Sequence, residues 1–195
     1  MIDYSSVQNN EMKIADLAKQ VSKDELRDSS NESIDRMLAL LENAVDADIT
    51  FDPSDEGASD PYAAEGEEGI GWSLGHLIAH VTAGSEEGAT FSSVLARGHA
   101  LEERPRYETP WRDITTVAQC VQRLEESRRM RNAYLDTWPD TPHLDVIRAG
   151  MSGQFAEWTG PLNAIGCFLL GLGHELIHFD QIAEVMRQSA AARSA

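Results

Sequence analysis

The sequence predicts an all-α protein, a four-helix bundle with long connecting loops. Apolar residues recur every three or four positions in four long segments, which is the period of a helix that buries one face. No segment shows the strict apolar and polar alternation of a half-buried strand. With 195 residues, 42% of them hydrophobic, we expect one domain over 1–195 with a core from about 22 to 188.

Each expected helix begins at a recognisable start signal. The first opens with S-x-x-E at Ser22 and Glu25, the pattern of a capping box. Ser73 is the expected N-cap of the second helix, and Pro161 is a favoured first-turn residue for the fourth. The expected ranges are about Ser22 to Val45, Ser73 to Arg97, Asp113 to Trp138, and Pro161 to Gln188.

Three connections are longer than the roughly two to eight residues that join neighbouring helices of a bundle. They span residues 46–71, 98–112 and 139–160. Loops of this length usually carry function or are disordered, so we expect them to cross over or to cover one end of the bundle.

The charge is strongly acidic, with 16 Lys and Arg against 33 Asp and Glu and a net charge of -17. Such a surface repels phosphate backbones and anionic lipid, so we expect neither nucleic acid nor membrane as a partner. The N-terminus lacks the basic and apolar regions of a signal peptide. Cys120 and Cys167 lie in apolar helical patterns and are expected as buried free thiols, which favours a cytoplasmic location.

The arginines are concentrated in one part of the chain. Residues 97–131 hold eight of the sixteen basic residues, whereas 37–96 hold twelve acidic residues and no Lys or Arg. These regions either offset each other in the fold or form an arginine-lined mouth for a small anionic ligand. In the second case Arg128 and Arg131 are the expected substrate contacts, since they fall near the continuation of the apolar stripe of the third helix.

Four of the six histidines form two pairs at i,i+4 spacing. His76 and His80 lie in "HLIAH", and His174 and His178 lie in "HELIH". Each pair places two imidazoles on one helical face, and two such faces of a bundle can converge on one metal ion. Imidazole suits zinc, nickel, copper and iron alike, so the ligands do not identify the metal.

The H-E-x-x-H spacing of "HELIH" also occurs in zinc peptidases, but the rest of the chain disfavours that function. The extended peptidase motif has a glycine and a third histidine downstream, where this chain has Gln181 and Glu184. The third ligand must therefore come from earlier in the chain. Glu175 is then either a base beside a ligand or a surface residue of the helix.

Two stretches together resemble the DinB-like family. "GWSLGHLIAHVTAGSEE", with Trp72, Ser73 and His80, is similar to the family's second-helix signature. "HELIHFDQIAEVMRQ" is similar to its H-x-x-x-H-x-x-Q-I motif in the last helix, with His178 and Gln181 at matching places. The resemblance covers about residues 22 to 188 and implies a four-helix bundle of DinB-like type.

The resemblance also implies an open metal site formed by His80, His174 and His178, usually with zinc or nickel. Relatives include thiol S-transferases and isomerases that use mycothiol, bacillithiol or glutathione, and many are homodimers. His76 stands where relatives often carry glutamate, so it is expected as a fourth ligand, a support for a ligand, or a bystander. Gln181 is expected either as a ligand or as a residue that orients one.

The expected function is that of a metal-dependent enzyme, an S-transferase or hydrolase-like, which activates a small thiol or water for transfer to an electrophilic small molecule. The alternative is a metal-binding protein without turnover, for sensing, storage or partner binding. These two functions differ in whether the metal site keeps an open coordination position, which it loses if His76 is a ligand.

Overall fold

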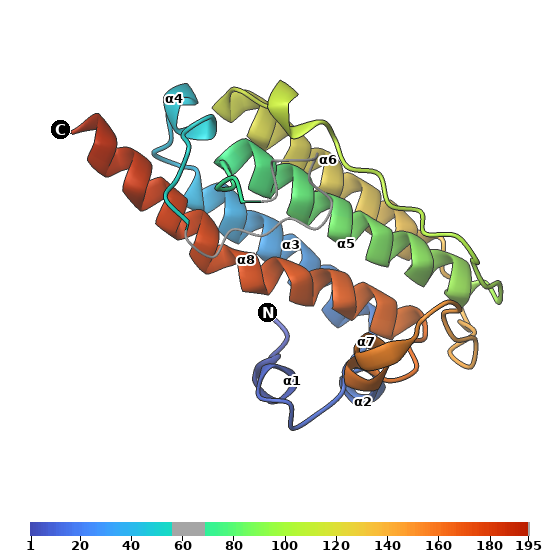
Figure 1. Cartoon of the computed structure of the whole chain (residues 1–195). Helices are drawn as coiled ribbons and strands as arrows, with labels where there is room; N and C mark the ends of the chain where they lie inside the picture. The colour runs from blue at the N-terminus through green and yellow to red at the C-terminus, as the bar shows by residue number, and fades with distance from the viewer. Residues whose placement is uncertain (56–68, 195) are drawn as a thin grey trace.

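The computed structural model describes residues 1–55 and 69–194 and confirms the all-α fold (Figure 1). No strand occurs in these residues. In the bundle, α5 packs against α6 and α8, and α3 packs against the same two helices from the other side. The four long helices are α3 (Lys23–Leu40), α5 (Leu74–Ala96), α6 (Val117–Asp136) and α8 (Ala164–Arg193).

Short helices cover the two ends of the bundle (Figure 1). Near the start of α8 lie α1 (Ser5–Gln8), α2 (Ile14–Leu17) with the 3₁₀ turn η1 (Ala18–Gln20), and α7 (Gly153–Thr159). Near the end of α8 lies α4 (Asp46–Ile49). A second 3₁₀ turn, η2 (Trp111–Asp113), packs on α5. The long connections therefore contain α4 and η2, which pack against the bundle, and α7, which packs against α2.

One bent pair of helices has the length and apolar composition of a membrane-spanning segment. Within residues 1–55 and 69–194, no helix taken singly has the length and apolar character needed to cross a bilayer. The pair α7 and α8 meets that criterion only when the two are joined across their 105° bend.

Local hydrogen bonds confirm two of the expected helix starts. The Glu25 backbone N–H donates to the Ser22 hydroxyl at 3.2 Å, and the Ser22 N–H donates to the Glu25 carboxylate at 2.8 Å. These bonds complete the capping box of α3. Ser73 caps α5 by accepting from the backbone N–H of His76 at 3.3 Å.

The other boundaries differ from the expectation. The first helix ends at Leu40 rather than Val45, because Val45 instead starts α4 and donates its N–H to the Asp48 carboxylate at 2.8 Å. The last helix begins after Asn163, whose side chain accepts from the N–H of Gly166 at 3.0 Å, so Pro161 lies outside it. The third begins after Thr116, which forms a capping box with Gln119, whereas residues 111–113 form η2.

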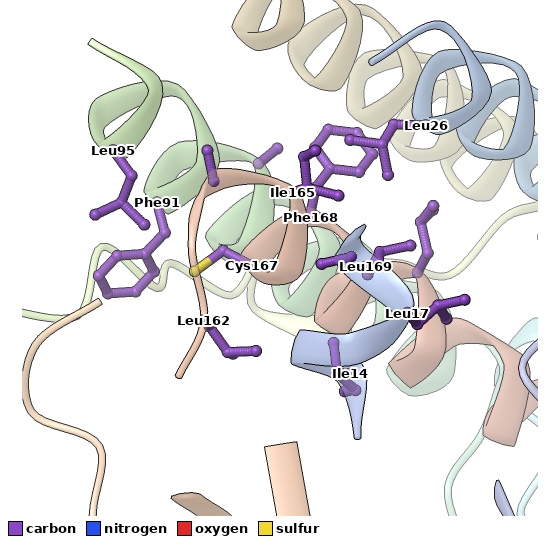
Figure 2. Packing of buried hydrophobic residues seen from close by; sticks show 14 of the residues in the cluster. Ile14, Leu17, Leu26, Phe91, Leu95, Leu162, Ile165, Cys167, Phe168 and Leu169 are labelled. Carbon is purple, nitrogen blue, oxygen red and sulfur yellow. The ribbon is translucent and has the colours of Figure 1, made fainter. Parts of the chain in front are cut away.

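The apolar core consists of two clusters stacked along the bundle axis. One lies toward the start of α8 and includes Leu26, Phe91 and Phe168 (Figure 2). The other lies toward its end and includes Leu77 and Phe179. Between the two clusters, each long helix contributes a buried polar or charged residue: Ser33 from α3, Ser85 from α5, Arg131 from α6 and Glu175 from α8.

These four side chains form one hydrogen-bonded layer around Glu175. Its Oε1 accepts from Arg131 Nη1 at 2.9 Å and from the Ser85 hydroxyl at 2.7 Å, and its Oε2 accepts from the Ser33 hydroxyl at 2.5 Å. Glu175 and Arg131 are both 0% exposed, so the surface position considered for Glu175 is wrong. A charged pair in this environment needs such additional donors to offset the loss of hydration.

Arg131→Met should destabilise the fold by about 3–5 kcal/mol, because it leaves the Glu175 carboxylate buried without its counterion. The free energy of unfolding from urea titration measures this loss. Arg128→Met on the same helix is the matched control. Arg128 pairs with Asp35 at 2.6 Å near the surface, so its loss should cost below about 1 kcal/mol. Equal losses for the two variants would contradict the role of the buried pair.

Candidate metal centre

Three histidines converge between α5 and α8. His80 comes from α5, and His174 and His178 come from successive turns of α8. One ring nitrogen of each lies within 4.8 Å of the others, and the Nε2 atoms of His80 and His174 are 2.9 Å apart. The structure thus brings together the three residues that the resemblance implies as metal ligands. Their spacing suits a single ion bound by all three.

His76 lies apart from this cluster. Its ring is stacked between two indoles, with ring centroids 4.5 Å from Trp72 and 4.7 Å from Trp111. It is 6% exposed. Among the residues that the structure describes, the cluster with metal-ligand spacing has three members and does not include His76. The structure therefore does not place His76 with the three clustered imidazoles.

Gln181 orients His178 from one turn further along α8. The Nδ1 of His178 lies 2.8 Å from the amide oxygen of Gln181, which can only accept. The proton of a neutral His178 therefore sits on Nδ1, and Nε2 carries the lone pair. The amide nitrogen of Gln181 donates in turn to Asp55 at 3.3 Å. This places Gln181 as a support for a ligand, one of the two roles expected for it.

Glu108 and Arg106 lie beside His80. The Nδ1 of His80 is 3.6 Å from the Glu108 carboxylate and 3.3 Å from the Arg106 guanidinium, which donates to Glu108 at 2.7 Å. Burial would raise the pKa of Glu108, but hydrogen bonds from His80 and Arg106 outweigh it and lower the pKa to about 2. Nδ1 of His80 thus faces a carboxylate that accepts a proton and a guanidinium that can only donate one, so these two contacts do not fix which ring nitrogen of His80 carries the proton.

Neither Glu108 nor Arg106 was among the site residues expected from the sequence. Two signals were available: the unusual length of the 98–112 connection, and the concentration of arginines in 97–131, which includes Arg106 but favoured Arg128 and Arg131 as contacts. The pairing with His80 arises from residues 26 and 28 positions apart on different elements, which no local period encodes.

Gly84 provides the space for the third imidazole. A Cβ atom at this position would lie 2.5 Å from Nδ1 of His174, far inside van der Waals contact. The same approach leaves this Nδ1 buried and without a hydrogen-bond partner in the described residues. The His174 ring is thus placed by its packing against α5 at Gly84 and by the 2.9 Å contact between its Nε2 and Nε2 of His80.

Two imidazoles of the cluster, those of His174 and His178, have lowered pKa values. Burial, followed by the neighbouring His80 and His178, lowers the pKa of His174 to about 3. Burial also lowers the pKa of His178. A histidine must be neutral to donate its lone pair to a metal, so the donor set fits a divalent cation at neutral pH.

The two arginines expected at the substrate lie elsewhere. Arg131 is enclosed in the core with Glu175, and Arg128 pairs with Asp35 and Glu125 on the outside of α6. Both residues have acidic partners that hold them away from the histidines, so the structure gives this expectation no support. Glu175 likewise commits both oxygens within the bundle, which argues against its role as a base at the metal centre.

A family model, that of the DinB superfamily, matches residues 31–182. The match includes α5, α6 and parts of α3 and α8, with all three clustered histidines. Neither curated proteins nor solved structures show a significant match to the chain.

The metal-free protein should lose stability as the pH falls below about 6.5. The folded-state pKa values of His174 and His178 lie below the ordinary 6.5, so in this range the unfolded chain takes up protons that the folded chain refuses. Above pH 6.5 both states are neutral at these groups and the effect vanishes. Urea unfolding in the presence of a chelator between pH 7.5 and 5 measures the slope. His174→Gln should flatten it, and an unchanged slope in this variant would contradict the assignment.

Gly84→Ala should weaken metal binding by at least about tenfold, because the His174 ring must move away from the added methyl group. Competition with a chromophoric chelator measures the affinity. Gly69→Ala is the control, since a Cβ atom there meets nothing within 4 Å. Unchanged affinity in Gly84→Ala would show that the His174 ring does not need its observed position.

Proposed function

The chain belongs to the DinB superfamily, and on that premise we propose that it binds a divalent metal ion through His80, His174 and His178 and activates a small thiol or water for transfer to an electrophilic small molecule. The observation that carries the proposal is the convergence of three imidazoles from two helices. A three-histidine donor set leaves room for an exchangeable ligand, as catalytic metal sites require.

Zinc and nickel are the proposed metals. Nitrogen donors suit both ions, and the cluster contains no thiolate that would favour a softer metal. When bound, such an ion acts as a Lewis acid that lowers the pKa of a water or a thiol and so supplies a nucleophile at neutral pH.

The residues of the chain itself supply orientation and charge. Gln181 and Glu108 hold the rings of His178 and His80 through their Nδ1 atoms. Arg106 lies beside His80, where its charge is offset by Glu108 at 2.7 Å and Glu87 at 3.8 Å. Glu108, with a pKa of about 2, is a weak base, so its carboxylate is suited to orient His80 rather than to accept a substrate proton.

His80→Ala should abolish most of the metal content, because it removes the one ligand that α5 contributes to the cluster. Metal analysis of the purified protein after equilibration with zinc or nickel measures this. His99→Ala is the control, since His99 is exposed in the connection after α5. Stoichiometric metal retained by His80→Ala would rule out the proposed ligand set.

The same samples distinguish an enzyme from a binding protein. We expect the metal-loaded wild type to consume thiol when mycothiol, bacillithiol and glutathione are each screened against a panel of electrophiles. His80→Ala and chelator-treated wild type should not consume it. Absence of consumption across the whole panel by the loaded protein would favour metal binding without turnover.

A further inference from the structure

Four aromatic rings stand in line between η2 and the metal centre. The ring of Trp111 stacks on His76 at 4.7 Å with a 7° angle between their planes. His76 stacks on Trp72 at 4.5 Å and 19°, and Trp72 stacks on His178 at 5.7 Å and 16°. We refer to Trp111, His76 and Trp72 as the aromatic ladder. Its inner end is thus in contact with a metal ligand.

Trp72 contacts ligands from both helices of the centre. Besides stacking on His178 of α8, its indole meets the ring of His80 of α5 edge to face, with centroids 4.5 Å apart and planes at 65°. Both geometries are favoured between aromatic rings. Trp72 is 7% exposed and immediately precedes the N-cap of α5, so its indole forms a fixed wall of the site.

The outer end of the ladder is also held in place. The guanidinium of Arg112 lies 4.1 Å from the Trp111 ring centroid, and η2 packs on α5. Just beyond η2, the carbonyl oxygen of Ile114 approaches Gly75 so closely that a Cβ atom there would lie 2.6 Å away. The absence of a side chain at Gly75 therefore lets this segment lie directly on the first turn of α5 beside His76.

We propose that His76 is a positioning residue whose flat ring, within the aromatic ladder, holds the imidazoles of His80 and His178 in the orientation that binds metal. This inference rests on the metal binding proposed above. Each of these imidazoles has polar contacts at Nδ1, with Gln181 for His178 and with Glu108 and Arg106 for His80, and contacts at one ring atom leave the ring free to tilt about it. Trp72 faces both rings and removes this freedom.

The aromatic ladder also connects η2 to the proposed metal ligands through Trp111. Among the residues that the structure describes, Trp111 stacks on His76 and on none of the three clustered histidines, yet it supports His76 and through it Trp72. The position of η2 is therefore coupled to the metal affinity of a site two rings away. This coupling separates a positioning role from ordinary core packing.

The test compares His76→Phe, His76→Ala and Trp111→Ala with the wild type. Phenylalanine keeps the flat ring and removes the nitrogens, whereas alanine removes the ring. We expect zinc affinity, measured by chelator competition, to fall about five- to tenfold in His76→Ala and Trp111→Ala and to stay within about twofold in His76→Phe. Trp158→Ala is the matched control, since Trp158 lies on α7 and is 39% exposed.

A second measurement does not depend on metal. In the metal-free protein, nitrogen-15 spectra of the imidazoles should show shifted or broadened signals of His80 and His178 in Trp111→Ala and unchanged signals in Trp158→Ala. Unchanged signals in Trp111→Ala would overturn the ladder. If the wild type binds neither zinc nor nickel, the proposed function fails, while these signals still decide whether the ladder positions the rings.

Two further outcomes would also overturn the inference. An equal loss of affinity in His76→Phe and His76→Ala would mean that a ring nitrogen of His76, and not its flat ring, is what the site requires. An equal loss in Trp158→Ala would mean that affinity follows general stability, which thermal unfolding of each variant measures in parallel. If His76→Ala does not fold, Trp111→Ala carries the comparison, because it changes a residue of η2 outside the long helices.

Discussion

The buried ion pair between Glu175 and Arg131 is the interaction on which the arrangement of the bundle depends. With Ser33 and Ser85 it joins all four long helices at one level, between the two apolar clusters. Apolar contacts tolerate small sliding of one helix along another, whereas a buried charge loses its partners when a helix shifts. The layer therefore sets the relative height of α5 and α8, and it does so directly beside His174.

The candidate metal centre lies next to this polar layer, because His174 is adjacent to Glu175 on α8. Glu175 points into the polar layer, whereas the adjacent His174 and, one turn on, His178 face His80 across the contact between α5 and α8. Gly84 lets the His174 ring approach α5, and Gln181, Glu108 and Trp72 act on the other two rings. Along a few residues of α8, the helical period thus directs Glu175 into the core and the proposed metal ligands His174 and His178 toward α5.

For several charged residues the sequence was compatible with both a site position and a structural position. Helical periodicity does not distinguish these two positions. Arg131 looks the same in sequence whether it lines a mouth or fills a core, because burial of arginine depends on a partner such as Glu175, 44 positions away. The helix boundaries at Val45 and Pro161 were misplaced for a similar reason. Asp48 and Asn163 provide stronger starts through hydrogen bonds than apolar periodicity indicates.

By itself, the sequence determined the all-α bundle, the caps at Ser22 and Ser73, and the two histidine pairs, because each depends on a period or spacing within one helix. Only the tertiary structure decided which histidines meet. It brings His80 together with His174 and His178 and places Glu108 beside His80. It also stacks the ring of His76 between the indoles of Trp72 and Trp111. The physical reason is that helix spacing encodes which side chains share a face, whereas the packing of α5, α8 and η2 determines which faces and loops come together.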